Sequence, residues 1–303
     1  MNGIIVMDKP AGFTSFDVVA VMRRLCHTKK IGHTGTLDPM ATGVLPLLLG
    51  SATRAAALLP DTDKEYIAGF KLGYSTDTQD ITGKQAAKSD VKVKRDDVEN
   101  ILTMFRGNIM QTPPMYSAVS IGGKRLYELA RKGIEVEREK RPITVYSLEL
   151  LDFDESDMSG KLKILCSKGT YIRTLCNDIG EALKTYGVMT SLRRTRASGF
   201  SVDDCVSLDE VKRLSAENNL AEIILPTEKL FVSYPALSVS EAQSNRFLNG
   251  GSLRLSYTSL RDSKNTGTGD IYRIMSPGGV FLGLGKTENE EIRILRLFPP
   301  ERQ

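Results

Sequence analysis

Hydrophobic and polar positions alternate along the chain with two periods, one typical of helices and one typical of strands. The clearest helical stripe has four apolar residues at the spacing of successive turns, Ile172, Leu175, Ile179 and Leu183. This stripe predicts a core-facing helix over residues 171–186 that ends before Gly187. Alternation at a period of two over residues 66–73 predicts a strand with one buried face.

The same two periods predict the other elements, with turn and capping residues at their boundaries. The expected helices are 15–26, 95–106, 124–132, 208–216 and 240–248. The expected strands are 4–7, 144–153, 161–167, 272–275, 280–284 and 291–297. Two of these helices begin with a capping box, Thr14 with Asp17 and Ser207 with Glu210. Strands and helices follow one another without the regular βαβ rhythm of a doubly wound sheet, so the pattern favours an α+β fold.

Breaks in the pattern divide the chain into two domains. Ser233-Tyr234-Pro235 marks the boundary, and the residues beyond it form short strand and turn patterns. We therefore expect a large domain over residues 1–235 and a small β-rich domain over 236–303. Residues 111–142 have the character of an insertion, with seven Lys/Arg against four Glu from Ile121 onward. Composition alone leaves both a solvated surface and a nucleic-acid contact open for this insertion.

Composition narrows the class of protein but not its activity. The chain has 303 residues, 41% of them hydrophobic and 26% charged, with a formal net charge of +4. These values are normal for a globular protein, and the charge permits an anionic partner without requiring one. No run approaches the roughly 18 apolar residues of a membrane helix, and the N-terminus lacks a signal-peptide pattern. We expect a cytoplasmic protein that does not bind membranes.

Common cofactor and metal motifs are missing from the sequence. No P-loop, no dinucleotide-binding glycine pattern and no HExxH motif occurs. The two histidines lie outside any nucleophile-elbow motif, and the four scattered cysteines offer no familiar zinc spacing. We therefore expect neither a metal nor a cofactor.

The stretch GHTGTLDPMATGVLP, residues 32–46, concentrates glycine and proline around a single carboxylate. This composition predicts a shaped loop. Asp38 directly precedes Pro39, which disfavours helical backbone at the aspartate. A carboxylate held in this way can act as a nucleophile, a general base or a charge stabiliser. An ordinary turn, with Asp38 capping a helix from Pro39, is the structural alternative.

Three further segments contain candidate side chains, each with a structural alternative. Tyr66 begins a predicted strand and could simply be a core residue. Arg173 lies in the first turn of a predicted helix, where it could reach an acid or face solvent. The basic run 192–196, LRRTR, could bind phosphates or be solvated.

Six stretches, taken together, resemble the successive motifs of the bacterial tRNA pseudouridine-55 synthases of the B class, the TruB family. They are MDKPAGFTS, GHTGTLDPMATGVLP, DKEYIAGFKLG, QTPPMYSAVSIGGKRLYELARKG, SKGTYIR and LRRTR, in the family's order across almost the whole chain. The stretch LSVSEAQSNRFLNGG is more loosely similar to the PUA module, a small RNA-binding β-barrel. The resemblance implies a pseudouridine synthase fold for residues 1–235 and a PUA-like domain for 236–303.

The resemblance also implies an activity and roles for individual residues. Enzymes of this family are isomerases that convert uridine 55 in the T-loop of tRNA to pseudouridine without metal or cofactor, after flipping the base out of its stack. Asp38 would be the nucleophile, Tyr66 would stack on the uracil where the proton on carbon 5 is lost, and Arg173 would pair with Asp38. The implied substrate-binding residues are His33, Tyr66, Tyr171 and Leu192. The implied RNA-contacting residues are Lys124, Arg125, Arg131, Lys132, Arg193 and Arg194.

The same resemblance implies that the partner is tRNA, bound through its T-arm. It implies a monomer that needs no other protein, and a further role in assisting tRNA folding.

Three alternatives remain open at this point. One is a guide-RNA-dependent pseudouridylase that works with partner proteins. Another is a non-catalytic RNA-binding or RNA-folding protein. The third is a carboxylate-based nucleoside hydrolase, for which no second acid stands out.

Overall fold

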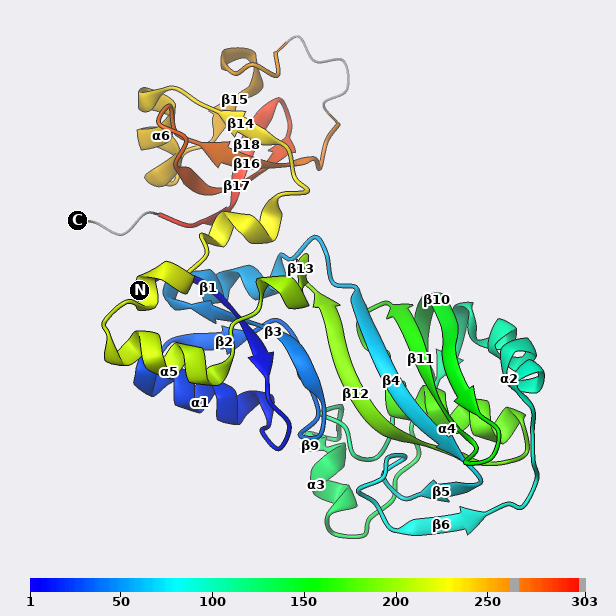
Figure 1. Cartoon of the computed structure of the whole chain (residues 1–303). Coiled ribbons are helices and arrows are strands. Elements are labelled where there is room, and N and C mark those ends of the chain that lie inside the picture. Colours follow the sequence, from blue (N-terminus) through cyan, green and yellow to red (C-terminus); the bar gives the residue numbers. More distant parts are fainter. Residues whose placement is uncertain (262–266, 300–303) are drawn as a thin grey trace.

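The computed structural model describes residues 1–261 and 267–299. Within these ranges its main element is a nine-stranded mixed sheet with the order β1-β3-β12-β4-β11-β10-β7, to which β2 adds beside β3 and β13 beside β12 (Figure 1). The strands are β1 (Gly3–Lys9), β2 (Ile31–His33), β3 (Thr42–Leu49), β4 (Lys64–Leu72), β7 (Gly107–Gln111), β10 (Arg141–Asp154), β11 (Ser159–Cys166), β12 (Gly187–Ala197) and β13 (Phe200–Ser201). Two small hairpins lie outside it, β5 (Tyr74–Thr76) with β6 (Gln85–Lys88), and β8 (Ser120–Ile121) with β9 (Lys124–Arg125).

The helices are α1 (Ser15–Leu25), α2 (Arg95–Leu102), α3 (Leu126–Ala130), α4 (Ile172–Ala182), α5 (Leu208–Ala216) and α6 (Glu241–Leu248). Of these, α1 and α5 cover one half of the sheet and α2 and α4 the other, whereas α3 belongs to the insertion and α6 packs in the C-terminal domain. Short 3₁₀ helices are η1 (Gly50–Ala57), η2 (Thr103–Phe105), η3 (Val202–Asp204), η4 (Leu220–Ile223), η5 (Thr227–Phe231) and η6 (Leu255–Tyr257). One hydrophobic core lies between α4 and the half that contains β4, β11 and β10, and a second lies between α1, α5 and the half that contains β1 and β3. The two halves meet where β3 pairs with β12.

Local sequence signals set most helix ends. The Thr14 hydroxyl accepts a hydrogen bond from the Asp17 N–H, and the Asp17 carboxylate accepts one from the Thr14 N–H, which confirms the predicted capping box. The predicted capping box of Ser207 is only half formed: its hydroxyl accepts from the Glu210 N–H, but the Glu210 carboxylate accepts from Arg213 instead. Three predicted helices are too long. The one expected over 95–106 ends at Leu102 and continues as the 3₁₀ helix η2. The helix expected over 171–186 ends at Ala182 and is followed by left-handed backbone, and the one expected over 124–132 loses its first two residues to β9.

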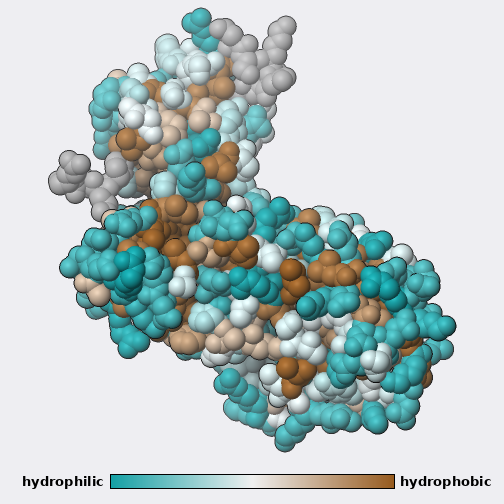
Figure 2. Space-filling model, viewed as in Figure 1, coloured by the Kyte–Doolittle hydropathy of each residue, from teal (hydrophilic) through white to brown (hydrophobic). Residues whose placement is uncertain are grey.

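A second, five-stranded sheet forms the C-terminal domain in the described part of the chain. Its strands run in the order β14 (Ala236–Ser238), β16 (Ile271–Met275), β17 (Phe281–Glu288), β18 (Glu291–Leu297) and β15 (Leu253–Arg254). Residues 262–266 and 300–303 of the expected 236–303 domain lie outside the described residues. An aromatic cluster of Phe231, Phe281 and Phe298 packs with Ile4 and Val6 of β1, so one apolar core joins the two domains, and apolar surface gathers around this junction in Figure 2.

Candidate functional site

The loop that contains Asp38 connects β2 to β3 at the meeting point of the two sheet halves. The prediction of one continuous loop over 32–46 is wrong at both ends, because the apolar residues that follow Thr42 pair with β1 as a strand and residues 32–33 belong to β2. No helix begins at Pro39; the Ala41 N–H instead donates to the Asp38 carbonyl at 3.1 Å in a turn. The Asp38 side chain remains 34% exposed, so it is accessible to a substrate.

Asp38 is paired with Arg173, as expected from the sequence. Arg173 Nε lies 2.9 Å from Asp38 Oδ2, and Arg173 Nη2 lies 3.3 Å from Asp38 Oδ1. The guanidinium is almost fully buried and also donates to the carbonyls of Thr78 (3.1 Å) and Tyr116 (2.8 Å). Two segments besides the aspartate loop therefore hold the arginine, and its charge faces the carboxylate in a two-pronged arrangement typical of strong pairs.

Asp80 is a site residue that the sequence reasoning missed. Its Oδ2 lies 3.8 Å from Arg173 Nε, and its side chain is 7% exposed. Its Oδ1 accepts hydrogen bonds from the Thr78 hydroxyl (2.8 Å), the Thr82 N–H (2.9 Å) and the Thr82 hydroxyl (2.5 Å). The spacing of threonines around this aspartate is a local turn signal, and nothing in it points toward Arg173.

Tyr66 lies on β4 in the same apolar cluster as Leu37, Ala41 and Leu192. The structure therefore brings together Tyr66 and Leu192, two of the predicted substrate-binding residues, directly beside the aspartate loop. Burial raises the pKa of Tyr66 to about 12, and the Arg194 guanidinium beside it opposes this shift. The phenol is neutral near pH 7 and can serve as a hydrogen-bond donor or a stacking surface.

Tyr171 is held by its backbone. Its N–H donates to Gln111 Oε1 at 2.8 Å, and its carbonyl accepts from Gln111 Nε2 at 3.0 Å. Gln111 is 2% exposed and lies at the end of β7, where the insertion begins. This reciprocal pair, which the sequence reasoning also missed, fixes the chain two residues before Arg173.

His33 and Lys9 flank the aspartate loop from two strands. Burial lowers the pKa of His33, with a smaller contribution from the charge of Arg194, and its Nδ1 is buried without a hydrogen-bond partner among the described residues. Lys9 Nζ donates to the carbonyls of Pro10, Phe13 and Pro39 at 2.8, 2.5 and 3.2 Å. Burial lowers the pKa of Lys9 to about 8, against the opposing influence of Asp38. Lys9 ties the turn after Asp38 to the end of β1.

The structure corrects the prediction that Arg194 contacts RNA. The run LRRTR is part of β12, whose side chains alternate between two faces, and Arg194 is 0% exposed. Its guanidinium donates to the carbonyls of Val44, Thr36 and Gly35. Arg193, its neighbour, remains 42% exposed and forms a bidentate ion pair with Asp8 at 2.9 and 3.0 Å.

The four basic residues predicted for the insertion all face solvent, Lys124, Arg125, Arg131 and Lys132. Arg125 donates to the Ala118 carbonyl at 2.6 Å, and the Arg131 guanidinium lies 5.4 Å from the centre of the Tyr127 ring. The insertion begins beside the site, since Tyr116 within it accepts a hydrogen bond from Arg173.

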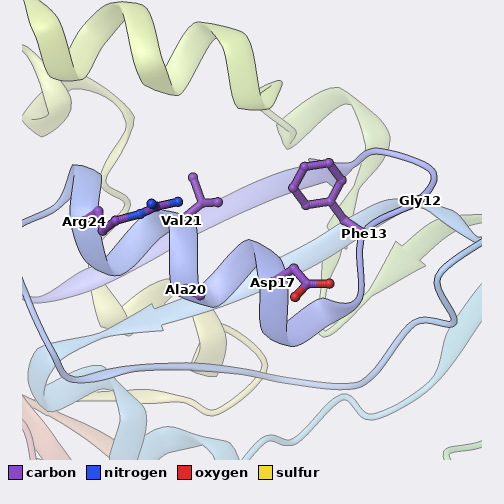
Figure 3. Close-up of a pocket in the computed structure, with 6 residues that line it drawn as sticks. All are labelled: Gly12, Phe13, Asp17, Ala20, Val21 and Arg24. Carbon is purple, nitrogen blue, oxygen red and sulfur yellow. The ribbon is translucent and has the colours of Figure 1, made fainter.

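Few other features of the described residues could form a site. No group of three or more histidine, cysteine or acidic side chains there could hold a metal ion, and no helix of the described chain is long and apolar enough to cross a membrane. A shallow pocket of about 330 Å³ beside α1 is lined by Gly12, Phe13, Asp17, Ala20, Val21 and Arg24 (Figure 3). The pocket adjoins the site, since the Gly12 N–H donates to the Pro39 carbonyl at 2.9 Å and the Phe13 carbonyl accepts from Lys9 Nζ.

Comparison with known families identifies the chain. A model of the N-terminal domain of TruB family pseudouridylate synthases matches residues 23–172, and a model of the tRNA pseudouridylate synthase B C-terminal domain matches residues 173–232. The chain belongs to the TruB family of pseudouridylate synthases. In this TruB-family chain the boundary between the two matches falls at the start of α4, inside the large domain, so it does not coincide with the beginning of the second sheet at Ala236.

Individual relatives support the same family. The tRNA pseudouridine synthase B of Clostridium tetani is 42% identical over 298 residues, which is 98% of this chain and 99% of the relative. That of Geobacillus thermodenitrificans is 44% identical over 261 residues, 84% and 86% of the two chains. A chain of the solved Cbf5-Nop10-Gar1 complex superposes with a TM-score of 0.75 at 27% identity, covering 98% of this TruB-family chain and 85% of that one. The expected α+β pseudouridine synthase fold is confirmed, and the C-terminal sheet is consistent with a PUA-like domain.

Proposed function

We propose that this enzyme converts uridine 55 in the T-loop of tRNA to pseudouridine, with Asp38 as the nucleophile. The observation that carries the proposal is the accessible Asp38 carboxylate, which is paired with buried Arg173 and lies in a loop that packs beside Tyr66. The names of the relatives, tRNA pseudouridine synthase B, support tRNA as the substrate. The position of the uridine rests on the resemblance of the GHTGTLDP motif.

The chemistry requires two bond changes and one proton exchange. The bond between ribose C1′ and uracil N1 breaks, a bond between C1′ and C5 forms, the proton on C5 leaves, and N1 gains a proton. Asp38 attacks as the nucleophile and forms a covalent intermediate with the substrate. Arg173 holds the Asp38 carboxylate in place and balances its charge. Tyr66 and Leu192 line the pocket of the flipped base, and Tyr171 and His33 border it. Stacking on an aromatic ring, worth about 1–3 kcal/mol per base, offsets part of the cost of base flipping.

The insertion and the C-terminal domain supply the remaining RNA contacts in this proposal. The four exposed basic side chains of the insertion neutralise phosphates of the T-arm, and residues 236–303 act as a PUA-like RNA-binding domain. The enzyme acts alone, as a monomer. The solved Cbf5 neighbour was crystallised with Nop10 and Gar1. Activity of the purified chain without partners therefore distinguishes an enzyme that acts alone from one that needs partner proteins.

A tritium-release experiment tests the proposal. The purified chain is mixed with an unmodified tRNA transcript that carries tritium at C5 of its uridines. We expect release near one equivalent per tRNA, none from a transcript with cytidine at position 55, and none from the Asp38→Asn variant, which still binds tRNA within a few-fold of wild type. The exposed Asp209→Asn variant on α5 serves as the control. Release by Asp38→Asn would rule out the nucleophile, and release from the cytidine-55 transcript would rule out the position.

A further inference from the structure

We propose that Arg194 is a positioning residue that holds the aspartate loop and Tyr66 in a fixed mutual arrangement. It touches neither the substrate nor the reacting atoms, and it acts through the backbone of the loop and through the tyrosine. The inference rests on the proposed roles of Asp38 and Tyr66, and it assigns a function to a residue that the sequence alone placed at the RNA surface.

The hydrogen bonds of Arg194 bracket the aspartate. Nη2 donates to the Gly35 carbonyl at 3.1 Å and Nη1 to the Thr36 carbonyl at 3.3 Å, both before Asp38 in the chain. Nε donates to the Val44 carbonyl at 2.7 Å, after Asp38. One rigid, planar guanidinium therefore ties both ends of the loop to β12 through donors on three separate nitrogens, a forked spacing that the compact ammonium of a lysine does not match.

The strand register places Arg194 between the two catalytic elements. It is directly opposite Tyr66 in the antiparallel pair of β12 and β4, and opposite Gly43 in the parallel pair of β12 and β3. Gly43 has φ of +101°, and a Cβ there would lie 2.2 Å from the Arg194 carbonyl oxygen. The strand that follows the aspartate loop thus packs tightly against the backbone of Arg194 on one side, while the strand that carries Tyr66 pairs with it on the other.

The charge of Arg194 argues against a purely structural role. No carboxylate lies within 4.0 Å of its guanidinium among the residues that the structure describes, so three backbone carbonyls and a hydrogen bond with the Tyr66 side chain compensate a fully buried cation. Burying a charge without an ion-pair partner is expensive, and here it is offset by hydrogen bonds to three carbonyls that flank Asp38 in the chain. The cation also acts on the site, because it adds to the burial that lowers the pKa of His33 and opposes the burial that raises the pKa of Tyr66.

Two substitutions of Arg194 test the proposal against a matched control. Arg194→Lys keeps the charge but not the three-donor geometry, and Arg194→Met removes both. In the control, Arg106→Lys, the replaced guanidinium donates to the Leu148 carbonyl through Nε (3.1 Å) and Nη2 (2.9 Å) at the far edge of the sheet. We expect the single-turnover rate of pseudouridine formation to fall about 100-fold in both Arg194 variants, a loss typical of a small misplacement of reacting groups, and the control to stay within twofold of wild type.

The affinity for tRNA and the rate of a double variant distinguish a positioning role of Arg194 from general damage to the fold. We expect the tRNA dissociation constants of the Arg194 variants to stay within about threefold of wild type, since the residue does not contact RNA. If Arg194 acts through the arrangement of Tyr66, Arg194→Lys costs less than about fivefold in a Tyr66→Phe background, because interacting residues are not additive. A full 100-fold loss in that background would overturn the role through Tyr66, and a loss of binding in parallel with the rate would overturn the proposal as a whole.

The remaining outcomes are also decisive. If Arg194→Met does not fold, as judged by circular dichroism, Arg194→Lys carries the same comparisons with the charge retained. Asp38→Asn is assayed alongside. Activity of Asp38→Asn would end the proposed function, whereas inactive Asp38→Asn together with fully active Arg194 variants would end only the role of Arg194.

Discussion

Arg173 and Asp38 are 135 positions apart in the sequence, yet Arg173 Nε lies 2.9 Å from Asp38 Oδ2. The first turn of α4 supplies the arginine and the β2–β3 loop supplies the aspartate. The guanidinium is also bonded to the carbonyls of Thr78 and Tyr116 and lies near the Asp80 carboxylate. Changes in these neighbouring segments should therefore affect catalysis through Arg173.

Replacing Asp80 by asparagine should slow catalysis without abolishing tRNA binding. The substitution removes a buried negative charge beside Arg173; the amide oxygen can accept the three hydrogen bonds of Oδ1, but the amide NH2 replaces the oxygen that faces the guanidinium. We expect a loss of stability of about 1–3 kcal/mol, as for a buried donor without an acceptor, and a clear fall in single-turnover rate. Asp77→Asn, exposed in the same turn, is the control. Equal rates for the two variants would contradict a role of Asp80 in holding Arg173.

Gln111→Ala should weaken the site by releasing the backbone of Tyr171. Two hydrogen bonds disappear, and the Tyr171 N–H loses its partner, while the Tyr171 carbonyl still accepts from the Leu175 N–H at 3.0 Å. Leaving the N–H unsatisfied costs about 1–3 kcal/mol, so we expect the midpoint of urea denaturation to fall and the rate to decrease. The matched control is Gln85→Ala, an exposed glutamine on β6. A Gln111→Ala variant with wild-type stability and rate would show that the clamp on Tyr171 is dispensable.

Alanine at the four exposed basic positions of the insertion should weaken tRNA binding and reduce its salt dependence. Each duplex phosphate that the variant no longer neutralises reduces the slope of log K against log salt by about 0.9. The affinity is measured by filter binding over a series of salt concentrations. The double variant Arg131→Ala/Lys132→Ala is compared with a control double variant, Lys212→Ala/Arg213→Ala. The control pair is also adjacent and basic, but it lies on α5 and forms ion pairs with acidic neighbours. An unchanged slope in the fourfold variant would exclude the insertion from the RNA interface.

Asp178→Asn should stabilise the enzyme at neutral pH. Burial on α4 raises the pKa of Asp178 to about 6, with a smaller contribution from Glu181 against the opposing Asn177 and Lys140. The folded state binds this proton more tightly than the unfolded state, so the stabilisation present below about pH 4 is lost as the pH rises through about 6.

After allowance for solvent screening, the asparagine variant should be more stable by about 1 kcal/mol at pH 7. Urea denaturation at pH 4, 5, 6 and 7 should also show a flatter pH profile between pH 4 and 6 than wild type. The exposed Asp209→Asn variant should follow the wild-type profile. An Asp178→Asn profile as steep as that of wild type would assign the pH dependence to other groups.

Elements whose signals are local could be predicted from the sequence. The capping box of Thr14 with Asp17, the apolar stripe of α4 and the period-two pattern of β4 depend on neighbours within a few positions, so they are legible without any tertiary contact. The motif around Asp38 likewise indicates the family, and the family resemblance predicts that Tyr66 and Arg173 belong to the same site.

The roles of the other polar side chains of the site follow from contacts between distant segments of the chain. Whether Arg194 faces RNA or the interior depends on which strands flank β12, and Asp80 and Gln111 reach the site through pairings between segments far apart in the chain. A buried polar residue satisfied by distant backbone has the same local sequence signature as an exposed one. Its burial follows from sheet order and register, which short-range periodicity does not specify.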